Sequence, residues 1–161
     1  MPPLQAYFQQ IDSKYRCVRS VYYDKPIGSN WRLNYHQDLC VNVKTEFDQV
    51  ALKNGLKRGG YYEVKAPIEI LENSITARIH LDDCSLENGA LHIIPGSHKK
   101  GIIDCVESEI KNEQLIELNE GEVLLMSPLL LHASGCNRSN KSRRIIHLEF
   151  STLDLPWYER Y

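Results

Sequence analysis

The chain has 161 residues, of which 42% are hydrophobic, and its 19 basic and 21 acidic residues leave a formal net charge of −2 at pH 7. This length fits one domain with a real core, the mixed charges make nucleic acid and anionic membranes unexpected partners, and no apolar run approaches the roughly 20 residues of a membrane span. Five cysteines without a Cys-x-x-Cys pair, and no segment resembling a signal peptide, predict a reduced, cytoplasmic protein.

Hydrophobic periodicity and turn residues predict one short helix at 4–11, followed by a series of short strands. The expected strands cover 15–23, 31–43, 74–81, 90–94, 123–126, 128–132 and 143–151. The expected loops and turns cover 24–30, 45–62, 82–89, 95–97, 104–117, 120–122 and 135–142, with a short turn or strand at 67–73 and an outer tail at 153–161. Many short strands separated by Gly, Pro and Asn indicate an all-β sandwich or barrel, and Asn88-Gly89 favours a tight hairpin.

The strand expected at 31–43 carries an imidazole and a carboxylate, His36 and Asp38. Side chains two positions apart on a strand share a face, so these two groups can chelate one ion. A third ligand is available at His132, which closes a run of leucines. Two histidines and one carboxylate form the arrangement of non-haem Fe(II) oxygenases, which leaves coordination positions open.

Each of these signals has a simpler interpretation. The His-x-Asp tripeptide is also typical of a surface strand with two solvated polar groups, and a histidine after an apolar run is often a hydrogen-bonded core residue. Four further histidines compete for any ligand role, and spacing alone does not select among them: His80, His92, His98 and His147.

Two basic residues follow His132 at a spacing that one returning strand can span. Arg143 and Arg144 lie 11 and 12 positions beyond it, so an adjacent antiparallel strand can return a guanidinium to the same pocket. Arginine binds carboxylates in two-point geometry, and Ser134 shares the face of His132 if the strand continues. The alternative is a solvated pair of charges at the start of a strand.

Three blocks of sequence carry a family resemblance: His36-Gln37-Asp38-Leu39, then Leu86 to Leu91 running into Ile94 to Lys99, then Gly121 to Val123 and Pro128 to Gly135 with Arg143 after them. In this order they resemble the phytanoyl-CoA dioxygenase family of Fe(II)- and 2-oxoglutarate-dependent oxygenases. The resemblance covers 15–151, nearly the whole chain. It implies a single domain over 1–161 with a double-stranded β-helix, or jelly roll, and a few short peripheral helices. The N-terminal region is shorter than family members usually carry, which fits either a minimal version or a fragment.

The resemblance also implies a site. His36, Asp38 and His132 would hold iron, and Arg143, helped by Ser134, would bind the distal carboxylate of 2-oxoglutarate. Strand alternation leaves Arg144 as a second candidate for that carboxylate. Two weaker pocket candidates rest only on alternation and proximity in sequence: Arg19 and Asn42.

The function implied is hydroxylation of a small organic substrate by dioxygen, with succinate and CO₂ as co-products. Related halogenases replace the carboxylate ligand with a small residue, so Asp38 favours hydroxylation. Two rival interpretations stay open: a non-catalytic jelly roll that binds metal or 2-oxoglutarate, and a cupin-like hydrolase or isomerase with Zn or Mn. Neither the substrate nor the oligomeric state follows from the sequence, although an exposed sheet edge would favour self-association.

Overall fold

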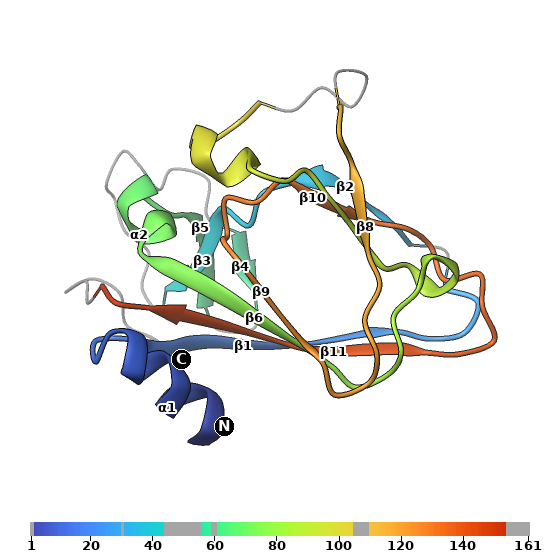
Figure 1. Ribbon diagram of the computed structural model, residues 1–161. Coiled ribbons are helices and arrows are strands. Elements are labelled where there is room, and N and C mark those ends of the chain that lie inside the picture. Colours follow the sequence, from blue (N-terminus) through green and yellow to red (C-terminus); the bar gives the residue numbers. More distant parts are fainter. Residues whose placement is uncertain (1, 30, 44–55, 59–60, 105–109, 154–161) are drawn as a thin grey trace.

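The strands expected at 74–81 and 143–151 are neighbours at the centre of the larger of two facing sheets (Figure 1). The structure is a computed structural model that describes residues 2–29, 31–43, 56–58, 61–104 and 110–153. The larger sheet is antiparallel and has the strand order β1-β11-β6-β9. Its strands are β1 (Arg16–Lys25), β11 (Arg143–Ser151), β6 (Ser74–His80) and β9 (Val123–Met126).

The facing sheet has the order β2-β10-β7-β8 and is also antiparallel. Its strands are β2 (Leu33–His36), β10 (His132–Ser134), β7 (Leu91–Ile93) and β8 (Gln114–Ile116). A three-stranded sheet extends one end of the sandwich with β3 (Cys40–Val43), β5 (Tyr61–Lys65) and β4 (Leu56–Arg58). The peripheral helical elements are α1 (Pro2–Ile11), α2 (Ile68–Glu72), and the single turns Leu86–Asn88 and Ser97–Lys100. No helix in these ranges is long and apolar enough to span a membrane.

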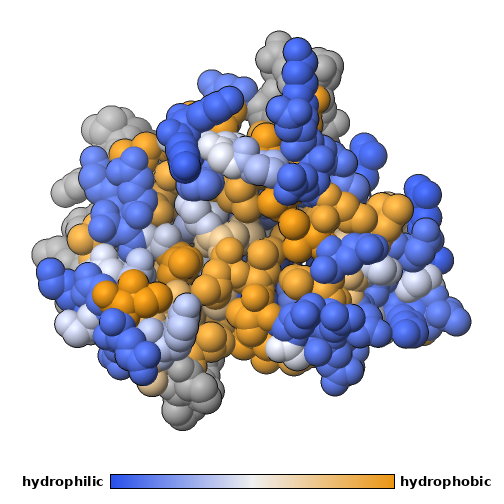
Figure 2. Space-filling model, in the orientation of Figure 1, coloured by the Kyte–Doolittle hydropathy of each residue, from blue (hydrophilic) through white to orange (hydrophobic). Residues whose placement is uncertain are grey.

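Alternation along the larger sheet separates an apolar outer face from a polar inner one. On the outer face, Phe8 of α1 stacks against Phe150 with ring centroids 4.3 Å apart, and Leu148 lies in the same cluster. This contact explains why the short helix forms, because its apolar stripe is buried on the sheet. Beyond α1, the edge-strand residues Val123 and Leu125 stay 38% exposed, and Figure 2 shows apolar side chains across the middle of that view.

The inner face of the larger sheet is unusually polar. Its buried inward-facing residues include Lys25, Thr76, Arg78, His80, Arg143, His147 and Glu149. Buried charges destabilise a fold unless they are paired or bind a ligand. The inner face is therefore a candidate binding surface and not only a hydrophobic core. One apolar cluster lies around Val43 and Leu71, at the end with the three-stranded sheet. Another lies around Leu91 and Met126, between the two four-stranded sheets.

The all-β architecture with short peripheral helices is confirmed, and the strands at 123–126 and 143–151 have the predicted bounds. The single strand predicted at 31–43 is wrong, since the chain leaves β2 after His36 and enters β3 only at Cys40. The break follows from Gln37, which is 8% exposed and points its amide into the interior.

Other predicted elements also differ. The segment 67–73 contains helix α2, and the strand predicted at 128–132 begins only at His132. Within the loop predicted at 45–62, β4 occupies 56–58 and β5 begins at Tyr61. Asn88-Gly89 makes no tight hairpin, because β6 and β7 belong to different sheets and the connection between them includes a turn of 3-10 helix. The segment 45–55 and the tail from 154 onward lie outside the described residues.

Candidate metal centre

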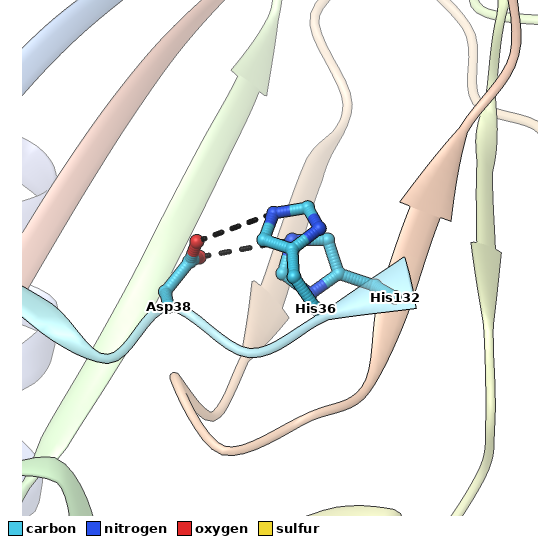
Figure 3. Close-up of side chains that lie close together, drawn as sticks. All are labelled: His36, Asp38 and His132. Atoms are coloured by element: carbon cyan, nitrogen blue, oxygen red, sulfur yellow. Dashed lines mark ion pairs between the residues drawn. The ribbon is translucent and has the colours of Figure 1, made fainter. Parts of the chain in front are cut away.

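His36, Asp38 and His132 meet between the two sheets, with one potential ligand atom from each lying within 4.8 Å of the others. Figure 3 shows the Asp38 carboxylate facing both rings: His36 Nε2 is 3.8 Å from one oxygen, and His132 Nε2 is 3.8 Å from the other. Asp38 Oδ2 is buried and accepts no hydrogen bond from the described residues. Two imidazoles and an unsatisfied carboxylate are a donor set that fits a divalent transition metal with open coordination positions.

The backbone holds these ligands in place from three directions. His36 and His132 are register partners in β2 and β10. Between His36 and Asp38, the Gln37 amide donates to the carbonyls of Leu129 and Gly101, at 2.6 Å and 2.9 Å, and accepts from the N–H of residue 103. The Asp38 N–H donates to the Pro128 carbonyl at 2.9 Å. The strand break therefore turns Gln37 inward as an anchor and leaves its two neighbours facing the cavity.

Hydrogen bonds fix which ring nitrogen each histidine presents. His36 Nδ1 lies 2.7 Å from the Asn34 carbonyl, and His132 Nδ1 lies 2.8 Å from the Leu130 carbonyl. A carbonyl only accepts, so both Nδ1 atoms carry a proton and both neutral rings leave a lone pair on Nε2. Such outer contacts orient metal-binding histidines and raise their basicity.

The charges around the site favour ionised Asp38 and neutral His132. Burial opposes ionisation of Asp38, but nearby positive charge, from His132 and His147 when they are protonated and from Arg78 at any ordinary pH, holds its pKa below the ordinary value. Burial lowers the pKa of His132 to about 4, although Asp38 opposes the shift. These are the protonation states that bind a metal ion.

The two arginines that the sequence left open lie on opposite faces of β11. Arg143 is 2% exposed and lines the same cavity as the three ligands, where its Nε and Nη1 have no hydrogen-bond acceptor among the described residues. Arg144 is exposed and forms two hydrogen bonds with the Asp82 carboxylate, at 2.9 Å and 2.7 Å. Of these two consecutive arginines, Arg143 is the one placed to receive an anion in the cavity.

Ser134 lines the cavity beside Arg143, but Asn42 and Arg19 do not. Asn42 lies on β3 opposite Glu63. Arg19 forms an ion pair with Glu149 at 2.9 Å. Of the competing histidines, His92 pairs with Glu113 at 2.8 Å, His80 is buried near the Glu122 carbonyl, and His98 lies in the turn Ser97–Lys100.

Two buried cations near the centre were not predicted from the sequence. Lys25 is fully buried at the end of β1, where its ammonium donates to Gly135 O and Ser134 Oγ and lies 3.9 Å from the centroid of the Trp31 ring. Burial and nearby Arg143 lower the pKa of Lys25 to about 8. Lys25 thus ties the larger sheet to Ser134.

Arg78 is the second such cation and lines the cavity from β6. Its Nη1 donates to His147 Nδ1 at 3.0 Å, and His147 Nε2 lies 3.5 Å from Glu149. The signal that would have found both cations is strand parity: Lys25 shares a face with Tyr23, and Arg78 shares one with His80.

The cavity that joins these groups is narrow. The space open to the centre of a water-sized molecule measures about 30 Å³, and all atom-free space, including the part open to solvent, measures about 360 Å³. Trp31 and Leu33, 39% and 44% exposed, stand on its solvent side.

Comparison with known proteins places this geometry in context. The family model described as phytanoyl-CoA dioxygenase matches residues 16–145. A methylphosphonate hydroxylase from Gimesia maris is 27% identical over 105 residues, covering 59% of this chain and 40% of that protein. The human peroxisomal phytanoyl-CoA dioxygenase is 23% identical over 140 residues, covering 75% of this chain and 40% of that protein. The chain thus spans about 40% of the length of these two curated relatives.

Solved structures share the fold. EvdMO1 superposes with a TM-score of 0.65 at 21% identity, covering 94% of this chain and 30% of that one. EvdO2 from Micromonospora carbonacea, solved with 2-oxoglutarate, superposes with a TM-score of 0.60 at 16% identity, covering 98% and 69%. The 2-oxoglutarate-dependent epimerase SnoN superposes with a TM-score of 0.63 at 14% identity, covering 93% and 52%. The jelly roll is therefore shared with non-haem oxygenases.

Proposed function

The chain belongs to the phytanoyl-CoA dioxygenase family, and from that premise we propose that it is an Fe(II)- and 2-oxoglutarate-dependent oxygenase that hydroxylates a small organic molecule. The observation that carries the proposal is the convergence of His36, Asp38 and His132 within 4.8 Å, in a cavity where Nε and Nη1 of Arg143 have no hydrogen-bond acceptor among the described residues. A metal site alone is common to many activities. A metal site joined to a buried arginine that has N–H groups left to donate fits a cosubstrate that is both a chelator and a carboxylate.

The three ligands would hold iron on one side and leave the other side for cosubstrate and dioxygen. Bound iron and 2-oxoglutarate would supply the oxidising power for inserting oxygen into a C–H bond, with succinate and CO₂ as co-products. Asp38 supplies the carboxylate ligand that related halogenases lack, which supports hydroxylation.

The remaining residues orient the cosubstrate and limit access of water. Arg143 and Ser134 would hold its distal carboxylate, and Lys25 keeps Ser134 in place through its ammonium contact of 3.4 Å. Trp31 and Leu33 border the open side, where a substrate would approach. Exclusion of bulk water by such a wall strengthens the electrostatic contacts inside.

Substrate identity is proposed only as a class. The two curated relatives are named for a phosphonate and for an acyl-CoA thioester, so family membership does not restrict the substrate further than a small organic molecule.

The proposal is tested by measuring succinate release from purified protein supplied with Fe(II), 2-oxoglutarate and dioxygen against a panel of small organic acids, phosphonates and thioesters. We expect succinate only when iron and 2-oxoglutarate are both present, and none from Asp38→Ala or His36→Ala. Binding of 2-oxoglutarate without succinate release across the panel would instead support a non-catalytic binding protein. Activity with Zn or Mn and without 2-oxoglutarate would support the hydrolase or isomerase alternative.

A further inference from the structure

We propose that Arg78 is a second cosubstrate-binding residue, whose guanidinium contacts the carboxylate of 2-oxoglutarate at the metal end of the cavity, opposite the carboxylate held by Arg143. This inference rests on the proposed function and deepens it. It makes the cavity a dicarboxylate site with one arginine for each end.

The first observation is that Arg78 is a buried cation whose ion pairing is incomplete. Arg78 is 7% exposed, and no carboxylate oxygen lies within ion-pair distance of it among the described residues. A guanidinium only donates, so its 3.0 Å contact makes His147 Nδ1 an acceptor and leaves the His147 proton on Nε2, facing Glu149. Arg78 Nε is buried and has no hydrogen-bond acceptor in the described part of the chain. A buried cation in this state is costly unless an anion arrives.

The second observation is where Arg78 lies relative to Arg143. Arg78 is the register partner of His147 on the neighbouring strand, and Arg143 precedes His147 by four positions on the same face. The Cα positions of the two arginines are therefore about 13 Å apart along the strand direction. The side chains of both residues line the cavity. An elongated anion lying along β11 would meet one guanidinium at each end.

The third observation concerns which end of the cavity Arg78 occupies. Lys25 is the register partner of Arg143 and donates to Ser134 Oγ, which places Arg143 at the Ser134 end of β10. His132 begins β10, two positions before Ser134, and Arg78 lines the same cavity about 13 Å along β11 from Arg143. Arg78 therefore serves the end where a chelating carboxylate would sit.

The charges of the cavity favour a dianion over a monoanion. Its lining has one carboxylate, Asp38, and two guanidinium groups, Arg78 and Arg143, for a sum of +1. A divalent metal raises the sum to +3, and buried Lys25 adjoins the same end as Arg143. A dicarboxylate compensates more of this charge than a monocarboxylate does, and buried charge that stays uncompensated is unfavourable.

The test combines removal of one ligand carboxylate with removal of one arginine. Anaerobic Fe(II)-loaded protein is titrated in a calorimeter with three ligands: 2-oxoglutarate, 2-oxopentanoate, which lacks the distal carboxylate, and 4-oxopentanoate, which lacks the carboxylate next to the keto group. The variants are Arg78→Gln, Arg143→Gln and the surface control Arg144→Gln. Binding is the readout, so the result does not depend on knowing the substrate.

Arg78→Gln is expected to weaken 2-oxoglutarate binding by about tenfold or more, the loss typical of a charge-assisted contact. It should also shrink the affinity difference between 2-oxoglutarate and 4-oxopentanoate, while the difference between 2-oxoglutarate and 2-oxopentanoate stays unchanged. Arg143→Gln should give the mirror pattern, and Arg144→Gln should change neither difference.

An Arg78→Gln protein that binds 2-oxoglutarate like the wild type, or that loses discrimination against 2-oxopentanoate instead, overturns the inference. If Arg78→Gln does not fold, Arg78→Lys is used, because it keeps the charge but loses the planar two-point donor geometry of the guanidinium. We expect this variant to bind 2-oxoglutarate more weakly and still to discriminate against 2-oxopentanoate. Wild-type affinity in Arg78→Lys would count against the inference. If the wild-type protein binds no 2-oxoglutarate, the proposed function itself is wrong. If the wild type binds 2-oxoglutarate and Arg78→Gln binds it equally well, only the role of Arg78 is wrong.

Discussion

His36 and His132 are register partners on adjacent strands, and each donates its Nδ1 proton to the main-chain carbonyl two residues before it, at 2.7 Å and 2.8 Å. The repeated contact gives both rings the same tautomer and turns both Nε2 atoms toward Asp38. The metal-binding proposal depends on this relationship, because a preorganised pair of imidazoles loses little freedom when a metal binds.

Substitution of a ligand should abolish iron binding without unfolding the protein. We expect His36→Ala and Asp38→Ala to lose stoichiometric Fe(II) binding in anaerobic equilibrium dialysis, because two remaining donors do not hold iron on one face. His92→Ala is the matched control, since His92 pairs with Glu113 outside the cavity. Full iron binding by both ligand variants would contradict the assignment.

The two consecutive arginines should differ sharply in their effect on the cosubstrate. Arg143→Gln is expected to raise the 2-oxoglutarate concentration needed for half-maximal succinate release by about tenfold or more, because a buried charge-assisted contact is lost. Arg144→Gln should have no such effect, because its partner is Asp82 on the surface. The opposite ranking of the two variants would show that the distal carboxylate is held elsewhere.

Gln37 should matter for stability although it binds no metal. Gln37→Leu removes three hydrogen bonds and leaves two carbonyls and one N–H without this partner, so we expect the free energy of unfolding to fall by about 2 to 4 kcal/mol in urea titrations. Gln10→Leu, on the exposed face of α1, is the control. A loss as small as that of the control would mean that the break between β2 and β3 is held by other contacts.

Gly89 and Gly121 allow backbone strain to be separated from a steric clash. Their φ angles are +87° and +85°, but a Cβ at Gly89 would lie 2.5 Å from the Gly135 carbonyl oxygen, whereas a Cβ at Gly121 would have open space. We expect Gly121→Ala to cost about 1 to 2 kcal/mol, the strain of the left-handed region, and Gly89→Ala to cost clearly more. Equal losses in thermal or urea unfolding would show that Gly135 moves aside freely.

Lys25 should make stability depend on alkaline pH. Its folded pKa of about 8 lies below the ordinary 10.5, so between these values the unfolded chain binds more protons and the free energy of unfolding rises with pH. The rise attributable to this group is at most about 3 kcal/mol. Urea titrations at either end of that range should show the rise in wild type and a smaller one in Lys25→Met; an identical rise in both proteins would contradict the assignment.

Much of the site could be predicted from the sequence because it depends on local order. His36 and Asp38 are two positions apart, Ser134 follows His132 by two, and Arg143 follows at a distance that one returning strand can span. Strand alternation and the family blocks were enough to predict their convergence, although Asp38 follows the end of β2 and does not lie on a strand. Their roles as iron and cosubstrate ligands stay predictions.

The missed features depend on tertiary contacts, because strand parity groups residues on one face of a strand without saying which face is buried. Arg78 and Lys25 are charged residues on strands, where solvation is the usual expectation, and only the facing sheet makes them interior. The break at 37–39 follows from buried hydrogen bonds of Gln37 to a loop more than 60 residues away. Arg143 and Arg144 could not be separated, because alternation assigns them to opposite faces without saying which face is inside.

The central claim is that iron and 2-oxoglutarate share one site between the sheets. Its most direct test is an anomalous-scattering map from crystals soaked anaerobically with Fe(II) and 2-oxoglutarate. We predict an iron peak within coordination distance of His36 Nε2, His132 Nε2 and an Asp38 oxygen, with 2-oxoglutarate extending from the iron to Arg143. Iron bound elsewhere, or no iron between these three side chains at saturating concentration, would contradict it.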